Sequence, residues 1–334
     1  MKTILVTGGA GYVGSHACKE LAKAGYRPVV YDNLSRGNEW SVRWGPLIQG
    51  ELADRDRLVQ VFKEHQPDAV LHFAALAYIG ESVDDPQRYY TNNVCGSLAL
   101  LSAMRSADCR QLVFSSTCAV YGTPSAMPIR ETTPTEPINP YGASKLMIER
   151  ILTDYETSYG LKVVVFRYFN AAGASPDGDI GEAHDPEPHL IPRALMAVTG
   201  NLPTVEILGT DYPTPDGTAI RDYIHVVDVA SAHVKALRYL DQGGANALLN
   251  LGTGRGHSVR DVIGTVARIT SRTIPTRESP RRPGDPAKLV ADAARAREML
   301  DWNPMHSDLN TIIADAWAWH RIPSRKIVTN KAAS

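Results

Sequence analysis

The segment NPYGASK (139–145) places a tyrosine and a lysine four residues apart. Four residues is about one turn of an α-helix, so Tyr141 and Lys145 would lie on the same helix face. A phenol ordinarily has a pKa of about 10, and a neighbouring cation favours its ionised form. A base is most useful when its pKa lies near the working pH. The pair therefore predicts a tyrosine that exchanges a proton beside a bound cofactor.

The N-terminal segment has the spacing of a phosphate-binding loop. A β-branched run, TILV (3–6), leads into Gly8, Gly11 and Gly14, and ACKELAKAG (17–25) then has the pattern of an amphipathic helix. The glycines would allow a tight turn and the close approach of a pyrophosphate to the backbone. The helix N-terminus would then face the phosphates. We interpret the segment as a dinucleotide-binding loop.

Asp32 indicates which dinucleotide the loop would bind. It ends a second apolar run, RPVVYD (27–32), at the position where a strand would reach the adenosine ribose. Its carboxylate can accept hydrogen bonds from the ribose hydroxyls and would repel a 2′-phosphate. The sequence therefore predicts NAD as the cofactor rather than NADP.

Strand and helix patterns alternate as far as residue 170. We expect strands at 47–52, 68–76, 111–122 and 162–170, and helices at 55–65, 93–107 and 144–160. This alternation predicts an α/β fold of the Rossmann type, with a doubly wound parallel sheet covered by helices on both faces. Ligands would bind beyond the carboxyl ends of the strands, where Asp32, Phe73, Ser115 to Thr117 and Asn170 fall.

The chain of 334 residues is too long for one ordinary core. After residue 175 it contains long loops rich in Pro, Gly and Asp, which are typical of functional segments. We therefore expect an NAD-binding domain at 1–175 and a smaller C-terminal α/β substrate domain at 176–334, with segments around 220–245 returning to the first domain. Residues after about 321 would form a tail.

Composition excludes some classes of partner. The net charge is −1, so no overall field would attract nucleic acid or an anionic membrane, and no apolar run is long enough to span a bilayer. The four cysteines form no CxxC pair, and we see no signal peptide. We expect reduced thiols and a cytoplasmic protein.

HDPEPH (184–189) contains two histidines that could suggest a metal site. Because no helical spacing or CxxC pair accompanies them, we interpret His184 and His189 as loop-surface residues and predict no metal ligand.

The glycine loop, the strand end Ser115-Ser116-Thr117 and the Tyr141/Lys145 pair together resemble the extended short-chain dehydrogenase/reductase family. In that family the tyrosine is the acid/base, the lysine lowers its pKa and binds the nicotinamide ribose, and the Ser/Thr hydroxyl binds the reacting oxygen. The resemblance implies that Tyr141, Lys145 and Thr117 are catalytic. Thr stands where many members have Ser, and either hydroxyl can donate and accept.

Longer motifs narrow the resemblance over nearly the whole chain. HFAAL, GESV, YYTNN, FSSTCAVYG, RYFNAAG, DYPTPDGT, RDYIHVVDVA, NLGTG and RRPGD resemble, in order, UDP-galactose (UDP-glucose) 4-epimerases. The NAD contacts implied by the resemblance are Gly8, Gly11, Tyr12, Val13, Gly14, Asp32, Asn33, Glu51, Leu52, Phe73, Ala74, Ala75, Asn92, Ser115, Tyr141, Lys145 and Tyr168. The implied UDP-sugar contacts are Thr117, Tyr141, Phe169, Asn170, Leu190, Leu208, Arg221, Arg282, Asp285 and Leu289. The two arginines suit a diphosphate, because a guanidinium fork matches phosphate oxygens.

The activity implied is inversion at C4 of UDP-glucose or UDP-galactose through a 4-keto intermediate. The family also pairs helices like 93–107 and 144–157 between subunits, which implies a homodimer. One alternative is a UDP-xylose/UDP-arabinose 4-epimerase, since FAALAYIGESV (73–83) is also similar to that group. Leu289, at the position that walls the sugar site in the family, predicts poor turnover of N-acetylated sugars.

Two further alternatives are more distant. Nucleotide-sugar 4,6-dehydratases place Asp-Glu directly after the threonine, where this chain has Cys118-Ala119. Redox-sensing NAD-binding regulators usually lack the tyrosine and lysine pair that this chain has.

Overall fold

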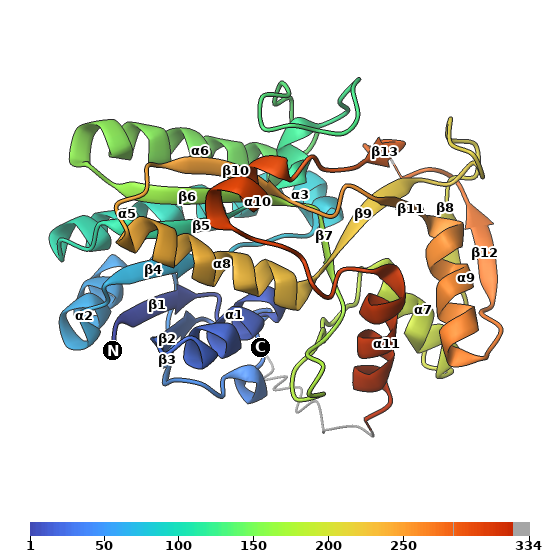
Figure 1. Ribbon diagram of the computed structural model, residues 1–334, viewed down its shortest axis with the longest axis horizontal. Helices are drawn as coiled ribbons and strands as arrows, with labels where there is room; N and C mark the ends of the chain where they lie inside the picture. The colour runs from blue at the N-terminus through green and yellow to red at the C-terminus, as the bar shows by residue number, and fades with distance from the viewer. Residues whose placement is uncertain (283, 323–334) are drawn as a thin grey trace.

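The computed structural model describes residues 1–282 and 284–322, and the C-terminal tail expected from the sequence lies outside them after residue 322. A seven-stranded sheet, built mainly from the first half of the chain, lies on the left in Figure 1. Every strand pair in it is parallel. Its order is β10 (Ala247–Leu251), β6 (Lys162–Tyr168), β5 (Gln111–Thr117), β4 (Ala69–His72), β1 (Thr3–Thr7), β2 (Arg27–Asp32) and β3 (Leu47–Gln49).

Helices cover both faces of this sheet. One face packs against α1 (Tyr12–Lys23), α8 (Val226–Asp241) and α10 (Ala294–Leu300), and the other against α2 (Arg55–His65), α5 (Gly96–Ser106) and α6 (Pro140–Tyr159). The central strands are therefore buried on both sides, which explains their nearly unbroken apolar runs. The predicted α/β fold is confirmed.

The register of the sheet aligns the carboxyl ends of its strands. Thr7 pairs with Tyr31 and His72, and Thr117 pairs with Tyr168. The glycine loop after β1 and the Ser-Thr end of β5 therefore open on the same edge. Short elements follow several of these ends: η1 (Glu39–Ser41), α3 (Ile79–Asp84), α4 (Pro86–Tyr89), the π-helix η2 (Tyr90–Cys95) and η3 (Cys118–Tyr121).

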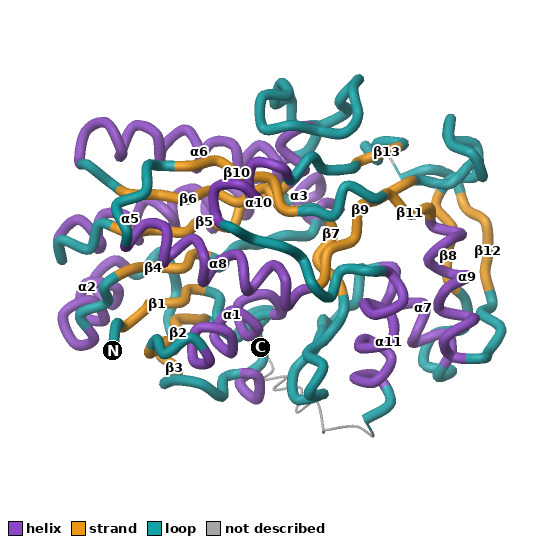
Figure 2. The backbone as a smooth tube through the Cα atoms, in the orientation of Figure 1, coloured by secondary structure: helices purple, strands orange, loops and turns teal. Residues whose placement is uncertain are grey.

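The remaining elements lie beyond the carboxyl ends of the large sheet (Figures 1 and 2). A second sheet contains β7 (Asn170–Ala172), β9 (Ile220–His225), β11 (Gly256–Ser258) and β13 (Lys288–Leu289), and a third pairs β8 (Val205–Leu208) with β12 (Thr276–Ser279). Their core packs with α7 (Leu190–Val198), α9 (Val259–Thr270) and α11 (Leu309–His320). The chain returns from β9 through α8 and β10 to the large sheet. The domain boundary at residue 175 remains a prediction.

Some element bounds differ from the expected ones. The expected strand at 68–76 ends at His72, and the expected helix at 93–107 starts earlier as the π-helix η2. Helix α6 starts at Pro140 rather than residue 144, because Asn139 caps it by accepting a hydrogen bond from the Gly142 N–H at 2.8 Å. The earlier start places Tyr141 within the first turn of the helix.

Across the described ranges 1–282 and 284–322, no helix is both long enough and apolar enough to cross a membrane. All four cysteines fall in these ranges, and each is a free thiol.

Candidate functional site

The glycine loop is a tight backbone cradle. Gly8 has a φ of 72°, and a Cβ there would lie 2.5 Å from the Ala74 nitrogen. A Cβ at Gly14 would clash with the Gly8 carbonyl oxygen. Helix α1 begins directly after Gly11 and has no acidic residue in its first turn, so its N-terminus is free to face an anion. These residues fit the pyrophosphate of NAD.

Asp32 lies at the end of β2, beside this loop. Its carboxylate is 7% exposed and accepts hydrogen bonds from the Ala10 N–H (3.0 Å) and the Leu34 N–H (2.8 Å). Burial raises the pKa of Asp32, while these two bonds act in the opposite direction. An ionised carboxylate has about four acceptor sites, so two bonds leave room for ribose hydroxyls. Asn33 donates to Glu51 at 2.9 Å, which brings both of these predicted contacts next to Asp32.

The other predicted NAD contacts follow β4 or lie near it. Phe73 packs against the His233 ring, with centroids 4.6 Å apart. Leu52 is buried under Gly96 at the start of α5. The Asn92 amide donates to Asn93 Oδ1 at 2.9 Å. Of the remaining four, Ala74 lies against Gly8, Ala75 follows it in the chain, Val13 on α1 packs against the core, and the Tyr12 hydroxyl donates to the Gly173 carbonyl at 2.7 Å.

Tyr141 and Thr117 meet at the end of β5. The Thr117 hydroxyl lowers the pKa of Tyr141 and so favours the phenolate. Burial nevertheless raises the pKa of Tyr141 above its ordinary value, and the charge of Tyr168 adds to this effect. In the protein without ligand, the phenol is therefore protonated at neutral pH. A positive charge brought beside Tyr141 would be needed to favour the phenolate.

Lys145 lies one turn further along α6, against the same strand. Its Nζ is buried, donates to the Ser115 carbonyl oxygen at 2.7 Å and lies 4.9 Å from the centre of the Phe114 ring. Burial lowers the pKa of Lys145 to about 7, and Glu149 acts against this shift. The Ser115 hydroxyl is hydrogen-bonded to the Tyr168 hydroxyl. The structure therefore brings Lys145, Ser115 and Tyr168 together at the strand end that carries Thr117.

A buried ion pair supports this strand end, and the sequence patterns did not single it out. The guanidinium of Arg167 and the carboxylate of Glu149 are 5% and 6% exposed, with Nε donating to Oε1 at 2.9 Å. The Ser116 hydroxyl also donates to Glu149. The available signal was an arginine inside the motif RYFN and an acid four residues after Lys145.

Asn93 is a second residue that the sequence patterns missed. It is 1% exposed, and its side chain accepts from the Leu76 N–H (2.9 Å) and donates to the Leu76 carbonyl (3.0 Å) and the Ser144 hydroxyl (3.0 Å). It therefore joins the loop after β4 to the helix that carries Tyr141. Its neighbour Asn92 was predicted instead, because both lie in YYTNN.

The predicted contacts for a diphosphate come together in the second half of the chain. Arg221 lies 3.7 Å from the Asp285 carboxylate, and Arg282 donates to that carboxylate through Nε (3.1 Å) and a terminal nitrogen (3.0 Å). The guanidinium groups of Arg221 and Arg282 thus both contact the carboxylate of Asp285. The Arg221 charge also reaches Cys118, next to Thr117, and lowers the pKa of that thiol against the dominant effect of burial.

The remaining predicted sugar contacts divide into two groups. Leu289 on β13 pairs with Arg221 and is buried in a cluster with Phe169, Val120 and Tyr121. Asn170, the first residue of β7, pairs with Tyr223. Elsewhere, Leu190 starts α7 and Leu208 ends β8.

His184 and His189 lie on a loop, as predicted, but not as isolated surface residues. The His184 side chain is 15% exposed, and both rings face the carboxylates of Glu182 and Glu187. Acids and histidines alternate in GEAHDPEPH (181–189), so the sequence already indicated that these side chains could meet within one loop.

Known proteins share this architecture. Residues 4–252 match the NAD dependent epimerase/dehydratase family. The chain is 51% identical to a UDP-glucose 4-epimerase from Rhizobium leguminosarum bv. trifolii over 319 residues, covering 96% of this chain and 97% of that protein. It matches the crystal structure of UDP-glucose 4-epimerase from Brucella ovis in complex with NAD with a TM-score of 0.92 and 52% identity, over 95% and 99% of the two chains. A second crystal structure that it matches is UDP-glucose-4-epimerase from Stenotrophomonas maltophila with bound NAD and formylated UDP-arabinopyranose. The TM-score is 0.93 and the identity 44%, and the match covers 96% of this chain and 98% of that chain.

These matches span nearly the whole chain at identities well above those at which only a fold is shared. They agree with the glycine cradle, the buried Asp32 and the Tyr141 and Lys145 pair. The family expected from the motifs is confirmed: the chain belongs to the NAD dependent epimerase/dehydratase family, among its UDP-glucose 4-epimerases.

Proposed function

We propose that this protein interconverts UDP-glucose and UDP-galactose by NAD-dependent inversion at C4, through a transient 4-keto sugar. The observation that carries this proposal is the arrangement at the end of β5. There the Thr117 hydroxyl lies beside Tyr141 and lowers its pKa, and Lys145 donates a hydrogen bond to the neighbouring carbonyl of Ser115. A proton-transfer group therefore lies at the same sheet edge as a cradle suited to a dinucleotide.

In the proposed reaction Tyr141 Oη takes the proton from the 4-hydroxyl of the sugar and later returns it. The Thr117 hydroxyl orients that oxygen, and Lys145 would hold the nicotinamide ribose so that the positive charge of the bound cofactor favours the phenolate form of Tyr141. When bound, NAD supplies the acceptor and donor of hydride. Arg221 and Arg282 anchor the diphosphate, so that the sugar can present either face while the nucleotide remains in position.

A 4,6-dehydratase would need an acid and a base directly after the threonine. Cys118 occupies the first of these positions, and burial raises the pKa of its thiol to about 12. Ala119 at the second position has no titratable group. Cys118 and Ala119 therefore cannot act as the acid and base that would remove water from the sugar. A redox-sensing NAD-binding regulator catalyses no reaction, so it would not require a buried lysine one helical turn from a tyrosine. This chain has both residues.

A UDP-pentose 4-epimerase activity is the second candidate. The Stenotrophomonas maltophila protein, 44% identical to this chain, was crystallised with formylated UDP-arabinopyranose. Incubation with UDP-glucose, UDP-galactose, UDP-xylose and UDP-arabinose, followed by chromatography, ranks the candidates. Preference for the pentoses by catalytic efficiency would overturn the UDP-glucose assignment.

The test of the mechanism is Tyr141→Phe. This variant should keep its bound NAD and its thermal stability but lose about 10²- to 10⁴-fold in turnover, the usual contribution of general acid–base catalysis. Tyr239→Phe, on α8 and outside both the site and the proposed dimer surface, is the matched control and should behave as wild type. If Tyr141→Phe retains most of its activity, the assignment of the base is wrong.

We also propose a homodimer through α5 and α6. Leu98 on α5 and Met147 and Tyr159 on α6 are 38%, 48% and 46% exposed, which leaves apolar area on both helices. Light scattering at micromolar concentration should give twice the chain mass, and a monomer would contradict the proposal. The free thiols support the expected cytoplasmic location.

A further inference from the structure

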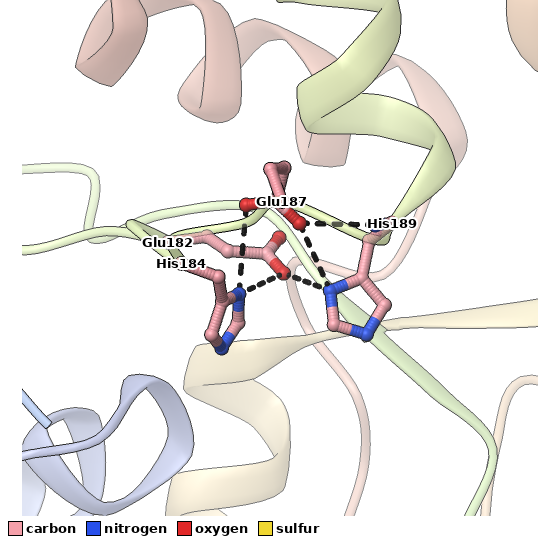
Figure 3. A group of neighbouring side chains, drawn as sticks. All are labelled: Glu182, His184, Glu187 and His189. Atoms are coloured by element: carbon pink, nitrogen blue, oxygen red, sulfur yellow. Dashed lines mark hydrogen bonds and ion pairs between the residues drawn. The ribbon is translucent and has the colours of Figure 1, made fainter. Parts of the chain in front are cut away.

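A cluster outside the site described above lies in the loop between β7 and α7. The side chains of Glu182, His184, Glu187 and His189 converge there (Figure 3). Each offers one atom that can bind a metal, and these four atoms lie within 4.8 Å of one another. Two imidazoles and two carboxylates thus surround one point.

The spacing of these atoms suits a tetrahedral ion. His184 Nδ1 lies 3.2 Å from Glu182 and 3.5 Å from Glu187, while His189 Nδ1 lies 2.6 Å from Glu182 and 3.2 Å from Glu187. Ligand atoms about 2.0–2.1 Å from a tetrahedral zinc ion are separated from each other by about 3.3 Å. Three of the four distances are close to that separation, the His189–Glu182 distance needs to widen by less than about 1 Å, and Glu187 would turn one of its two oxygens toward both imidazoles.

A second observation points to a ligand at the same place. Glu182 Oε1 and His184 Nδ1 are buried, and neither has a hydrogen bond of normal geometry. The Glu182 side chain is 5% exposed and points into the cluster (Figure 3). Buried polar atoms in proteins are nearly always hydrogen-bonded, whereas these two lie 3.2 Å apart in ion-pair contacts that require a protonated imidazole, so they need an explanation. An ion between them would satisfy both.

We propose that Glu182, His184, Glu187 and His189 bind one zinc ion. Two imidazole nitrogens favour zinc over magnesium or calcium, which take oxygen ligands. The two carboxylates balance its charge. Four protein ligands leave no open position for water or substrate, so the site is structural rather than catalytic. The half-exposed ring of His189 gives the ion a path from solvent.

The surroundings of the cluster indicate what the ion would do. Trp319 on α11 donates to the Glu182 carbonyl at 2.9 Å, and Asn38 donates to the Ala183 carbonyl at 3.1 Å. His184 also has edge-on contacts with the rings of Tyr12, in the first turn of α1, and Tyr78. The loop thus touches both the nucleotide-binding part and α11. Zinc would fix it between them.

The competing explanation is an ion-pair cluster without metal. In that case both imidazoles must be protonated to balance the carboxylates. Burial opposes this, but the carboxylates of Glu182 and Glu187 together outweigh burial and raise the pKa of His184 to about 9. The same two carboxylates together outweigh burial at His189 and raise its pKa to about 10. Zinc binding would displace these protons, whereas an ion-pair cluster would not respond to zinc.

The experiment measures zinc in the full-length protein. Protein treated with a chelator and then dialysed against zinc should retain about one zinc per chain, and its melting temperature should rise with zinc. His189→Gln, on the half-exposed ring, should weaken zinc binding by more than about 10- to 100-fold, because losing even an outer partner of a ligand costs that much. Glu187→Gln is the second variant, and His65→Gln, in the last turn of α2, is the control.

Proton release on zinc addition, followed with a pH indicator, is the second readout. Wild type and His65→Gln should release protons, and the two cluster variants should release far fewer. The proposal is overturned if wild type retains no stoichiometric zinc. It is equally overturned if wild type, His189→Gln and Glu187→Gln bind zinc alike, because zinc would then be held elsewhere. Activity is not needed to read either outcome.

Discussion

Replacing Lys145 with methionine tests how much it costs to keep a charged lysine inside this site. The Lys145 side chain is 2% exposed, and its ammonium donates to the Ser115 carbonyl at 2.7 Å. Burial lowers the pKa of Lys145 from 10.5 to about 7, and Glu149 offsets part of the effect. Methionine has a similar length and removes the charge, but it leaves the Ser115 carbonyl without this donor.

The direction of the pH dependence follows from the lowered pKa. Between pH 7 and 10.5 the unfolded chain binds a proton at Lys145 more readily than the folded chain does. Stability from this group therefore rises with pH across that window, and below pH 7 the full cost of burying the charge is present. A shift from 10.5 to about 7 corresponds to about 5 kcal/mol. We therefore expect the ionised form of Lys145 to cost the folded protein about 3–5 kcal/mol.

Lys145→Met avoids this cost and loses about 1–3 kcal/mol for the unsatisfied carbonyl. At pH 6 the variant should therefore be more stable than wild type by about 2 kcal/mol, and by pH 10 wild type should have gained about 3 kcal/mol relative to it. The measurement is urea unfolding of nucleotide-free protein from pH 6 to 10, followed by tryptophan fluorescence. Lys63→Met, exposed on α2, is the control and should show no such trend. A difference between wild type and Lys145→Met that does not change with pH would refute the reasoning.

Two further changes test the sugar site and the glycine loop. Leu289 is buried against Phe169, so we expect UDP-N-acetylglucosamine to react about 10- to 150-fold less efficiently than UDP-glucose, which corresponds to about 1–3 kcal/mol of crowding, and Leu289→Cys to reduce that gap. Equal catalytic efficiencies in wild type, or no gain in the variant, would contradict this. Gly14→Ala should clash with the Gly8 carbonyl and weaken NAD binding by at least about 10-fold in calorimetry. Gly264→Ala, in α9 with nothing within 4 Å of the new Cβ, should bind NAD as wild type does, and equal affinities for all three proteins would refute the steric argument.

Local sequence determined the elements and the chemistry-bearing residues of the first half of the chain. The alternation of apolar strands and amphipathic helices predicted α2 with its bounds and the large parallel sheet. The spacing of Gly8, Gly11 and Gly14 predicted the cradle, since only glycine can occupy a loop packed so closely against the following strand. The spacing of Tyr141 and Lys145 likewise predicted one helix face. These are short-range properties, and they are encoded in neighbouring residues.

Only the tertiary structure decided which distant residues meet. The ion pair between Arg167 and Glu149 joins a strand to a helix, and one buried cluster contains Leu289 and Phe169, which are 120 residues apart in the chain. No local pattern specifies such pairs, because packing brings them together. The same holds for the ionisation of the site: the sequence predicted a lysine charge that lowers the pKa of Tyr141, whereas burial raises the pKa of Tyr141 and lowers that of Lys145. Desolvation depends on everything that surrounds a group, so it is set by the fold and not by residue spacing.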